Sequence, residues 1–96
     1  MFVNIVHFPK IKEGKDPEFR QWFVESNRAY AGHRGFIRRI LLQPQDGENY
    51  IGIVEHESRE TFMAMHTSPT QAALRLRAEP LFEGNPRPAF YDVVID

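Results

Sequence analysis

Histidine is the side chain in this sequence that could do chemistry most directly, because its charge changes near neutral pH. The chain has four, at positions 7, 33, 56 and 66, and it has no cysteine. None of the four is paired at the i, i+2 or i, i+4 spacing that brings two metal ligands onto one strand or helix. A nucleophile elbow and a glycine-rich phosphate loop are also missing. The sequence therefore does not support a metal site, Ser-His-Asp catalysis or a phosphate site.

Asn4 and His7 are the polar side chains of an otherwise apolar strand, predicted over residues 2–8. Val, Ile and Phe dominate this stretch, and Pro9 ends it. Side chains alternate between the two faces of a strand, so Asn4 lies on one face and His7 on the other. Both faces are otherwise apolar, and such a strand must be covered on both sides. Asn4 is either a core amide bonded to nearby backbone or a polar group in a pocket.

A helix is predicted to follow, with Asp16 as its N-cap, Pro17 at its first position and Gly32 as its C-terminal stop. Its apolar stripe has the i, i+3, i+4, i+7 spacing and consists of Phe19, Trp22, Phe23, Ser26 and Tyr30. Trp22 and Tyr30 could each have one of two roles, packing in the core or stacking against a substrate. The indole N–H of Trp22 needs a hydrogen-bond partner in either case.

Three more strands are predicted, over residues 36–43, 50–56 and 89–95, with a loop over 81–88. An Asp-Gly turn at 44–47 joins the first two of these strands. Alternation places Phe36 and Arg38 on one face and Arg39 on the other. Both arginines are expected to be solvated or paired, although Arg38 could reach an anion in a pocket.

Two short helices are predicted between the last two strands. Ser58 caps a helix that runs to about His66. Ser68 caps a second piece that runs to about Ala78, with Gln71 positioned to close a capping box. The predicted order is therefore βαββαβ, which is typical of an α+β, ferredoxin-like fold with a four-stranded antiparallel sheet.

One face of this sheet is left without cover, because two helical regions can cover only the other face. A second copy of the same sheet is the simplest cover, so we expect a homodimer through the face that bears His7, with a barrel between the subunits. The 96 residues are expected to form a single domain, residues 1–96.

Composition narrows the class of protein. The hydrophobic content of 42% is typical of folded globular proteins, and the formal charge of −1 gives no general attraction to nucleic acid or an anionic membrane. Charges interrupt every apolar run, so no membrane span and no signal segment is expected. The absence of cysteine suits a reducing compartment, and we expect a soluble, cytoplasmic protein.

Several local phrases resemble the antibiotic biosynthesis monooxygenase (ABM) family, and together they extend over nearly the whole chain. They are Phe2-Val3-x-Ile5, Lys12-Glu13-Gly14-Lys15, the spacing Phe19…Phe23, Gly35-Phe36, Glu57-Ser58-Arg59-Glu60-x-Phe62, Thr67-Ser68-Pro69 and Tyr91-Asp92-Val93-Val94. The resemblance implies a dimeric α+β barrel with a pocket between helices and sheet in each subunit. It also implies oxidation of phenols to quinones by O₂ without metal or flavin, while a sister branch degrades haem.

The resemblance also suggests site residues. Asn4 matches a first-strand Asn of the oxygenase members, where an amide could stabilise negative charge on a phenolate or an oxygen intermediate. Relatives line the pocket from the second helical region, which here offers Phe62, Met65 and His66. Many relatives carry a His where this chain has Met65, so His66, one position later, is the candidate base. Trp22 and Tyr30 complete the expected binding residues.

The expected function is cofactor-independent oxidation of a phenolic or quinol-type aromatic molecule by O₂, with Asn4 and His66 as catalytic residues. The haem-degrading branch has a Trp in the second helical region and a haem-ligating His about ten residues later. Here those neighbourhoods hold Met65 and the run 72–75, which argues against haem degradation of that kind. A non-catalytic ligand-binding protein stays open as an alternative. An RNA-recognition module is rejected, because the third strand has Ile where stacking rings belong.

Overall fold

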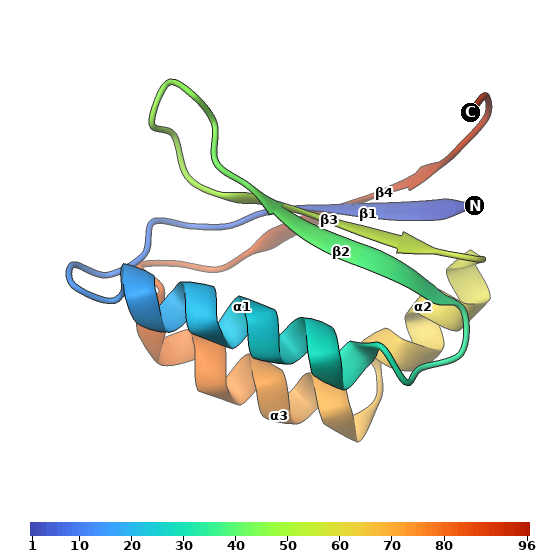
Figure 1. Cartoon of the computed structure of the whole chain (residues 1–96), viewed down its shortest axis with the longest axis horizontal. Coiled ribbons are helices and arrows are strands. Elements are labelled where there is room, and N and C mark those ends of the chain that lie inside the picture. The colour runs from blue at the N-terminus through green and yellow to red at the C-terminus, as the bar shows by residue number, and fades with distance from the viewer.

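The computed structural model describes residues 1–96, and its elements follow the predicted βαββαβ order (Figure 1). The helices are α1 (Asp16–Tyr30), α2 (Arg59–His66), α3 (Pro69–Ala78) and a short 3-10 turn, η1 (Glu79–Leu81). The strands are β1 (Phe2–His7), β2 (Phe36–Leu42), β3 (Ile51–His56) and β4 (Arg87–Asp92). None of the helices has the length and apolar run that crossing a membrane requires.

Every pair of neighbouring strands is antiparallel, and their order across the sheet is β2-β3-β1-β4. The chain therefore has the predicted α+β, ferredoxin-like fold. Figure 1 shows all the helices on one side of the sheet. The outer face is the side of the sheet that the helices do not cover.

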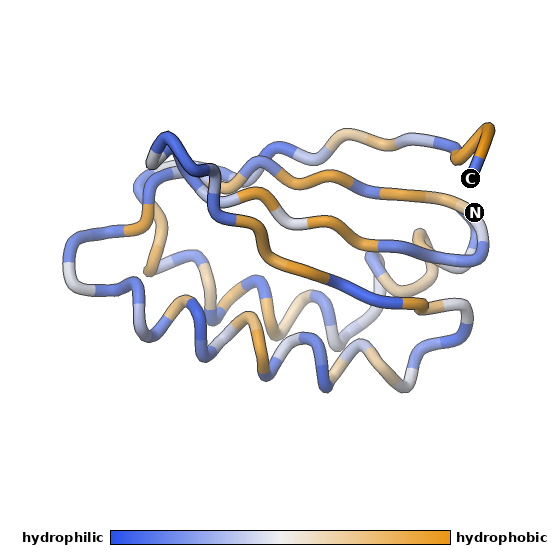
Figure 2. The backbone as a smooth tube through the Cα atoms, turned by 45° about the horizontal axis from the view of Figure 1, so that its top comes forward, coloured by the Kyte–Doolittle hydropathy of each residue, from blue (hydrophilic) through white to orange (hydrophobic).

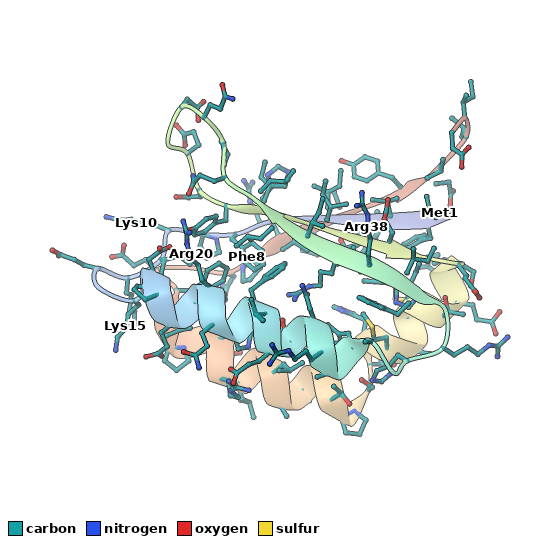
Figure 3. The ribbon with its side chains drawn as sticks, viewed as in Figure 1. Met1, Phe8, Lys10, Lys15, Arg20 and Arg38 are labelled. Atoms are coloured by element: carbon teal, nitrogen blue, oxygen red, sulfur yellow. The ribbon has the colours of Figure 1, made fainter.

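The alternation predicted for β1 is present in the structure. Asn4 lies on the helix side with 4% of its surface exposed, and His7 is exposed on the outer face. Phe8 shares the side of Asn4 and packs against Phe19 of α1, with ring centroids 5.2 Å apart (Figure 3). Fourteen buried hydrophobic residues form the core between sheet and helices, and Phe19 lies fully buried within it.

A β-bulge interrupts the pairing of β2 with β3. Phe36 pairs with His56 and Arg38 pairs with Glu55, the residue of β3 next to His56. Ile37 is therefore an extra residue in β2, with no partner of its own across the ladder. The bulge reverses the alternation that a regular strand would have, so Phe36 and Arg38 lie on opposite sides of the sheet.

The bulge determines which of the two neighbouring arginines faces the helices. Arg38 forms an ion pair with Glu55 on the outer face (Figure 3). Arg39 pairs across the ladder with Val54, whose side chain is buried beneath the helices. The prediction that Arg38 could reach a pocket is therefore wrong, because strict alternation does not allow for an extra residue.

Helix α1 begins and ends differently from the prediction. Its N-cap is Lys15, which makes no side-chain capping bond. Asp16 lies in the first turn instead, where it accepts a hydrogen bond from the Tyr50 hydroxyl and pairs with Arg20 at 3.1 Å. A tertiary contact with the start of β3 thus takes the carboxylate that was predicted to cap the helix.

The predicted glycine stop of α1 is also displaced. Gly32 has no positive φ, and Ala31, in an ordinary right-handed conformation, is the C-cap that follows Tyr30. Gly35 has φ +82° and leads into β2. A Cβ atom on Gly35 would lie 2.4 Å from the Thr61 Oγ1 atom, so both its backbone and its close contact with α2 require glycine.

Serine caps begin both α2 and α3, as predicted. The Ser58 hydroxyl accepts from the Thr61 backbone N–H, and the Ser68 hydroxyl accepts from the Gln71 backbone N–H. The predicted capping box at Ser68 is only half formed. The Gln71 side chain does not return to the cap, because its Oε1 atom accepts a hydrogen bond from the Tyr30 hydroxyl.

Strand β4 begins earlier than predicted and ends sooner. It starts at Arg87, so Pro88 lies within the strand, where it pairs with Val6 of β1. This is allowed because β4 is an edge strand, and a missing N–H does not interrupt a second ladder there. The strand stops at Asp92, opposite Phe2, which is the first residue of β1.

The outer face is apolar across its centre. Ile40, Ile53, Ile5 and Ala89 are cross-strand neighbours in one row, and each comes from a different strand. Tyr91, further along β4, is 49% exposed. Figure 2 shows hydrophobic stretches in the strands as well as in the helices that cover the other side. The homodimer remains a prediction.

Candidate functional site

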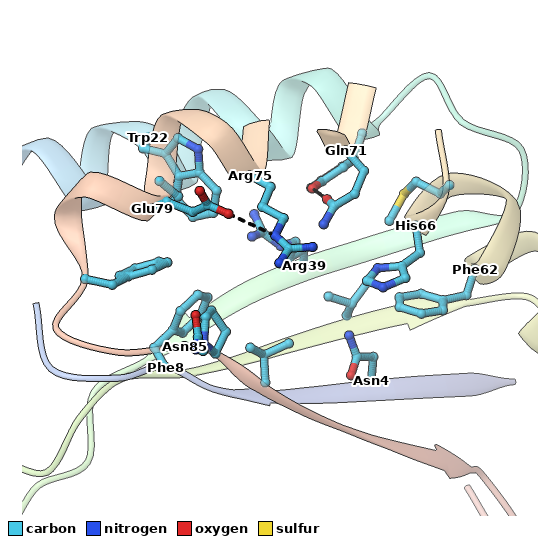
Figure 4. Close-up of a pocket in the computed structure, with 17 residues that line it drawn as sticks. Asn4, Phe8, Trp22, Arg39, Phe62, His66, Gln71, Arg75, Glu79 and Asn85 are labelled. Atoms are coloured by element: carbon cyan, nitrogen blue, oxygen red, sulfur yellow. Dashed lines mark hydrogen bonds and ion pairs between the residues drawn. The ribbon is translucent and has the colours of Figure 1, made fainter. Parts of the chain in front are cut away.

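A cavity of about 270 Å³ lies between the helix side of the sheet and the helices (Figure 4). All six residues that the sequence suggests for the site line it: Asn4, Trp22, Tyr30, Phe62, Met65 and His66. They come from β1, α1 and α2, which are far apart along the chain. The structure thus brings these residues together, and their roles remain predictions.

Part of the cavity floor is a single row of residues across the sheet. Arg39 on β2 is opposite Val54 on β3, and Val54 is opposite Asn4 on β1. All three line the cavity. Because adjacent strands lie about 4.8 Å apart, the backbones at Arg39 and Asn4 are separated by about 10 Å, with the apolar Val54 between them.

Asn4 is a buried amide that the protein does not satisfy. Its Oδ1 atom is buried and has no hydrogen-bond partner in the chain. Leaving a buried polar atom unpaired costs about 1–3 kcal/mol, so such an atom requires an explanation. Figure 4 shows the Asn4 side chain rising from β1 into the cavity. Rotation of the amide can present either its donor or its acceptor to a ligand.

His66 is the last residue of α2, and it lines the cavity although the residue as a whole is exposed to solvent. Its ring stacks on Phe62, with centroids 5.3 Å apart and an interplanar angle of 18°. Burial lowers the pKa of His66 below its ordinary value of 6.5, and the positive charge of Arg75 acts in the same direction. His66 is therefore neutral at pH 7 and can accept a proton.

Trp22 and Tyr30 have structural bonds as well as a place in the cavity wall. The Trp22 indole N–H donates to the Leu74 carbonyl at 3.0 Å, which ties α1 to α3. The Tyr30 hydroxyl donates to Gln71 Oε1. Burial raises the pKa of Tyr30, so its hydroxyl stays protonated and remains the donor in this bond.

Met65 connects the cavity wall to a buried histidine. Its Sδ atom lies 3.4 Å from Nε2 of His56, and the Thr61 hydroxyl lies 2.9 Å from Nδ1 of the same ring. His56 has no exposed surface and does not line the cavity. His56 is therefore part of the packing behind the cavity wall and has no access to the cavity.

Arg39 is the main cavity residue that the sequence reasoning missed. Its Nη1 atom donates to Asn27 Oδ1 at 2.9 Å and also to the Ser26 hydroxyl. The guanidinium lies over the Phe23 ring, 3.9 Å from its centroid, and near the rings of Tyr30 and Trp22.

No carboxylate balances the charge of Arg39, because none of the ion pairs in the chain includes it. Burial lowers the pKa of Arg39 well below its ordinary value, to about 10, and Tyr30 offsets part of this effect. Arg39 is therefore still a cation at pH 7. Two adjacent arginines in a strand with two apolar faces could have indicated that one of them enters the core.

The other charged residues of the cavity neutralise each other. Arg75 and Glu79, both of which line the cavity, form an ion pair at 3.2 Å (Figure 4). With His66 neutral, the cavity carries one uncompensated positive charge, on Arg39. No group of three His, Asp or Glu side chains is placed to hold a metal ion. The arrangement is suited to binding an aromatic ring with polar groups at both ends.

The chain is similar to known proteins in sequence and in fold. The family model for antibiotic biosynthesis monooxygenases matches residues 1–76. The haem-degrader MhuD from Mycobacterium tuberculosis, with two haems in its active site, is 30% identical over 100% of this chain and 98% of its own, with a TM-score of 0.79. A single-residue variant of MhuD with two manganese protoporphyrin IX molecules per active site is 32% identical over 100% and 97%, with a TM-score of 0.82.

SnoaB, a cofactor-independent oxygenase from Streptomyces nogalater, has the same fold at lower sequence identity. It is 21% identical over 99% of this chain and 92% of its own, with a TM-score of 0.78. At that level the likeness establishes the fold alone. No curated protein sequence matches the chain.

Proposed function

Because the chain belongs to the antibiotic biosynthesis monooxygenase family, we propose that its cavity is the active site of a cofactor-independent oxygenase. The substrate class is a phenolic or quinol-type small molecule, which O₂ oxidises to a quinone. The observation that carries this proposal is the unpaired, buried amide of Asn4 in an aromatic-lined cavity that also holds a neutral histidine.

The size of the cavity limits the substrate. Pockets for small molecules usually have volumes of about 300–1,000 Å³. At about 270 Å³ this cavity is just below that range. Its walls of Trp22, Phe62 and Phe8 suit a flat ring. We therefore expect a substrate with one or two rings.

The proposed reaction begins with removal of a proton from the substrate hydroxyl. His66 accepts this proton, and the Asn4 amide donates a hydrogen bond to the resulting phenolate. The anion gives one electron to O₂, and the two radicals combine to form a carbon–oxygen bond and a peroxide. Loss of the ring proton at that carbon then breaks the O–O bond. One oxygen atom remains in the quinone, and the other leaves in water.

Oxygen uptake with a panel of hydroquinones, naphthols and anthrones tests this proposal, with Asn4→Ala as the informative variant. Loss of one donor to developing negative charge lowers kcat by about 100-fold or more. His7→Ala is the matched control, because His7 is on the same strand but exposed on the outer face. Turnover no faster than in buffer, or equal turnover in Asn4→Ala and wild type, contradicts the proposal.

Haem is the alternative substrate, because MhuD is 30% identical to this chain. The cavity does not fit it well. Its volume is small for a tetrapyrrole, and Leu74, in the stretch where the haem-degrading branch has its haem-ligating His, is buried in the core. A haemin titration separates the two candidates. We expect no Soret shift, whereas a shift that disappears in His66→Ala favours haem.

A protein that binds aromatic molecules without oxidising them is the other alternative. It has the same cavity but predicts ligand binding with no oxygen consumption. We place the reaction in the cytoplasm and in a homodimer whose subunits meet through the outer faces of their sheets. The apolar row Ile40, Ile53, Ile5 and Ala89 supports this assembly, since a surface of this kind is commonly covered by a second sheet.

A further inference from the structure

Arg39 does not take part in the oxidation proposed above, and no carboxylate of the chain pairs with its charge. The guanidinium has five N–H donors, and its bonds to Ser26 and Asn27 both come from Nη1. Nε and Nη2 donate to no group in the chain, and the residue lines the cavity. Arg39 is half-buried. A cation withdrawn from water without a carboxylate is costly, so its natural complement is an anion supplied by a ligand.

A second donor lies at the same end of the cavity. Gln71 lines the cavity, and its Oε1 atom is occupied by the Tyr30 hydroxyl. Its Nε2 amino group is therefore the part of the side chain left for a ligand, and Figure 4 shows it turned into the cavity. Tyr30 contacts both residues: its hydroxyl is bonded to Gln71, and the Arg39 guanidinium lies 5.2 Å from its ring centroid. This end of the cavity offers donors and positive charge.

The opposite end of the floor row has a different character. Asn4 is neutral, and His66 and Phe62 are at the same end of the cavity (Figure 4). The backbones of Asn4 and Arg39 are about 10 Å apart, two strand spacings, with Val54 between them. A single aromatic ring with substituents on opposite sides can lie on Val54 and reach both ends. The cavity is thus divided into an anion end and a neutral, hydroxyl end.

We propose that the substrate is a hydroxyaromatic carboxylate, with its carboxylate bound by Arg39 and Gln71 and its hydroxyl at Asn4. This proposal rests on the proposed function for the identity of the reacting hydroxyl. The anion site itself stands on Arg39 alone. A planar guanidinium matches a carboxylate through paired hydrogen bonds, which a phenolate oxygen cannot provide. Arg39 and Gln71 are binding residues in this scheme, and they take no part in proton transfer.

Trp22 makes binding measurable without turnover, because it is the single tryptophan of the chain and lines the cavity. Quenching of its fluorescence by 4-hydroxybenzoate, methyl 4-hydroxybenzoate and 4-hydroxybenzamide gives three dissociation constants on the wild-type protein at pH 7. The three compounds have the same ring and hydroxyl, and only the first is an anion. We expect the acid to bind at least 10-fold more tightly than the ester or the amide. Equal affinities overturn the proposal.

The variant Arg39→Met assigns this preference to one side chain. It removes the charge and keeps an unbranched side chain, and the preference for the acid is expected to fall to within about 2-fold. Arg38→Met is the matched control, because Arg38 is the neighbouring arginine but pairs with Glu55 on the outer face. It is expected to keep the full preference. Loss of the preference in Arg38→Met, or its retention in Arg39→Met, overturns the assignment.

The binding readout and the oxygen readout separate this proposal from the proposed function. A preference for the acid that depends on Arg39, with no oxygen uptake, leaves the anion site standing and removes the oxygenase. Oxygen uptake with neutral hydroquinones, together with equal binding of acid and ester, supports the oxygenase and removes the anion site. Circular dichroism of each variant shows whether it is folded. The wild-type comparison of the three ligands does not depend on any variant.

Discussion

Asn4 and Arg39 are the two cavity side chains that the protein leaves without complementary partners. One has a buried oxygen that accepts no hydrogen bond, and the other has a positive charge with no carboxylate. Each lowers the stability of the empty protein, because polar groups removed from water are favourable only when they are paired. Groups that stay unpaired at such a cost are expected where a ligand supplies the partner.

His56 gives a prediction for the effect of pH on stability. Burial, and next the charge of His33, lower the pKa of His56, with Glu57 acting in the opposite direction. The folded pKa is therefore below the unfolded value of about 6.5, so the unfolded state binds more protons as the solution is acidified. Stability from this group is fully present above pH 6.5 and is lost as pH falls through the folded pKa. Urea midpoints measured at pH 8, 6.5 and 5 should show this decline.

The variant His56→Gln tests whether this histidine is responsible for the decline. The substitution removes the titration, so the loss of stability between pH 6.5 and pH 5 should become smaller than in wild type, whatever the change at pH 8. His7→Gln serves as the control because His7 is exposed on the outer face. The same acid-side slope in His56→Gln and wild type would show that other groups control it.

At the scale of elements, two glycines three residues apart are expected to respond in opposite ways to alanine. Gly35→Ala places a side chain at φ +82° and against Thr61, which should lower the unfolding free energy by about 2 kcal/mol or more. Gly32 has no positive φ, and a Cβ there meets nothing within 4 Å. Gly32→Ala should therefore change stability by less than about 1 kcal/mol. Chemical denaturation of both variants measures the contrast, and equal losses would contradict it.

Local sequence patterns predicted the elements well, because each depends on near neighbours. The serine caps at 58 and 68 and the apolar stripe of α1 are read within a few residues, and the structure has them. Asp16 and Gln71 were predicted to cap helices, and each instead bonds a side chain more than thirty residues away. A pattern read over a few neighbouring residues cannot indicate partners that are this distant in the sequence.

The same limit explains what was missed in the cavity. Asn4 could be placed from the period of β1 alone, since that strand is regular. Arg39 could not, because its side depends on the bulge at Ile37, and the bulge is set by how β2 pairs with β3. A shift of one residue exchanges Arg38 and Arg39 between the two faces. The pair of arginines was visible in the sequence, but the choice between them required the register.

At the scale of the whole molecule, the outer face predicts the oligomeric state. Light scattering should give a mass of twice 11.2 kDa at micromolar concentration. Ile53→Glu places a charge at the centre of the apolar row and should produce a folded monomer. Val24→Glu is the control, because Val24 is 51% exposed on α1, away from the sheet. A wild-type monomer, or a dimer unaffected by Ile53→Glu, would rule out assembly through this face.

The period of two along the strands has a consequence for how such a protein can diverge. The row Arg39, Val54, Asn4 lies on the cavity floor, and the adjacent row Ile40, Ile53, Ile5 lies on the outer face. Each residue of one row is the immediate chain neighbour of a residue in the other. Substitutions at alternate positions can therefore change ligand preference while they leave the opposite surface intact. The cavity floor and the outer face can therefore evolve independently, although their residues alternate along the same strands.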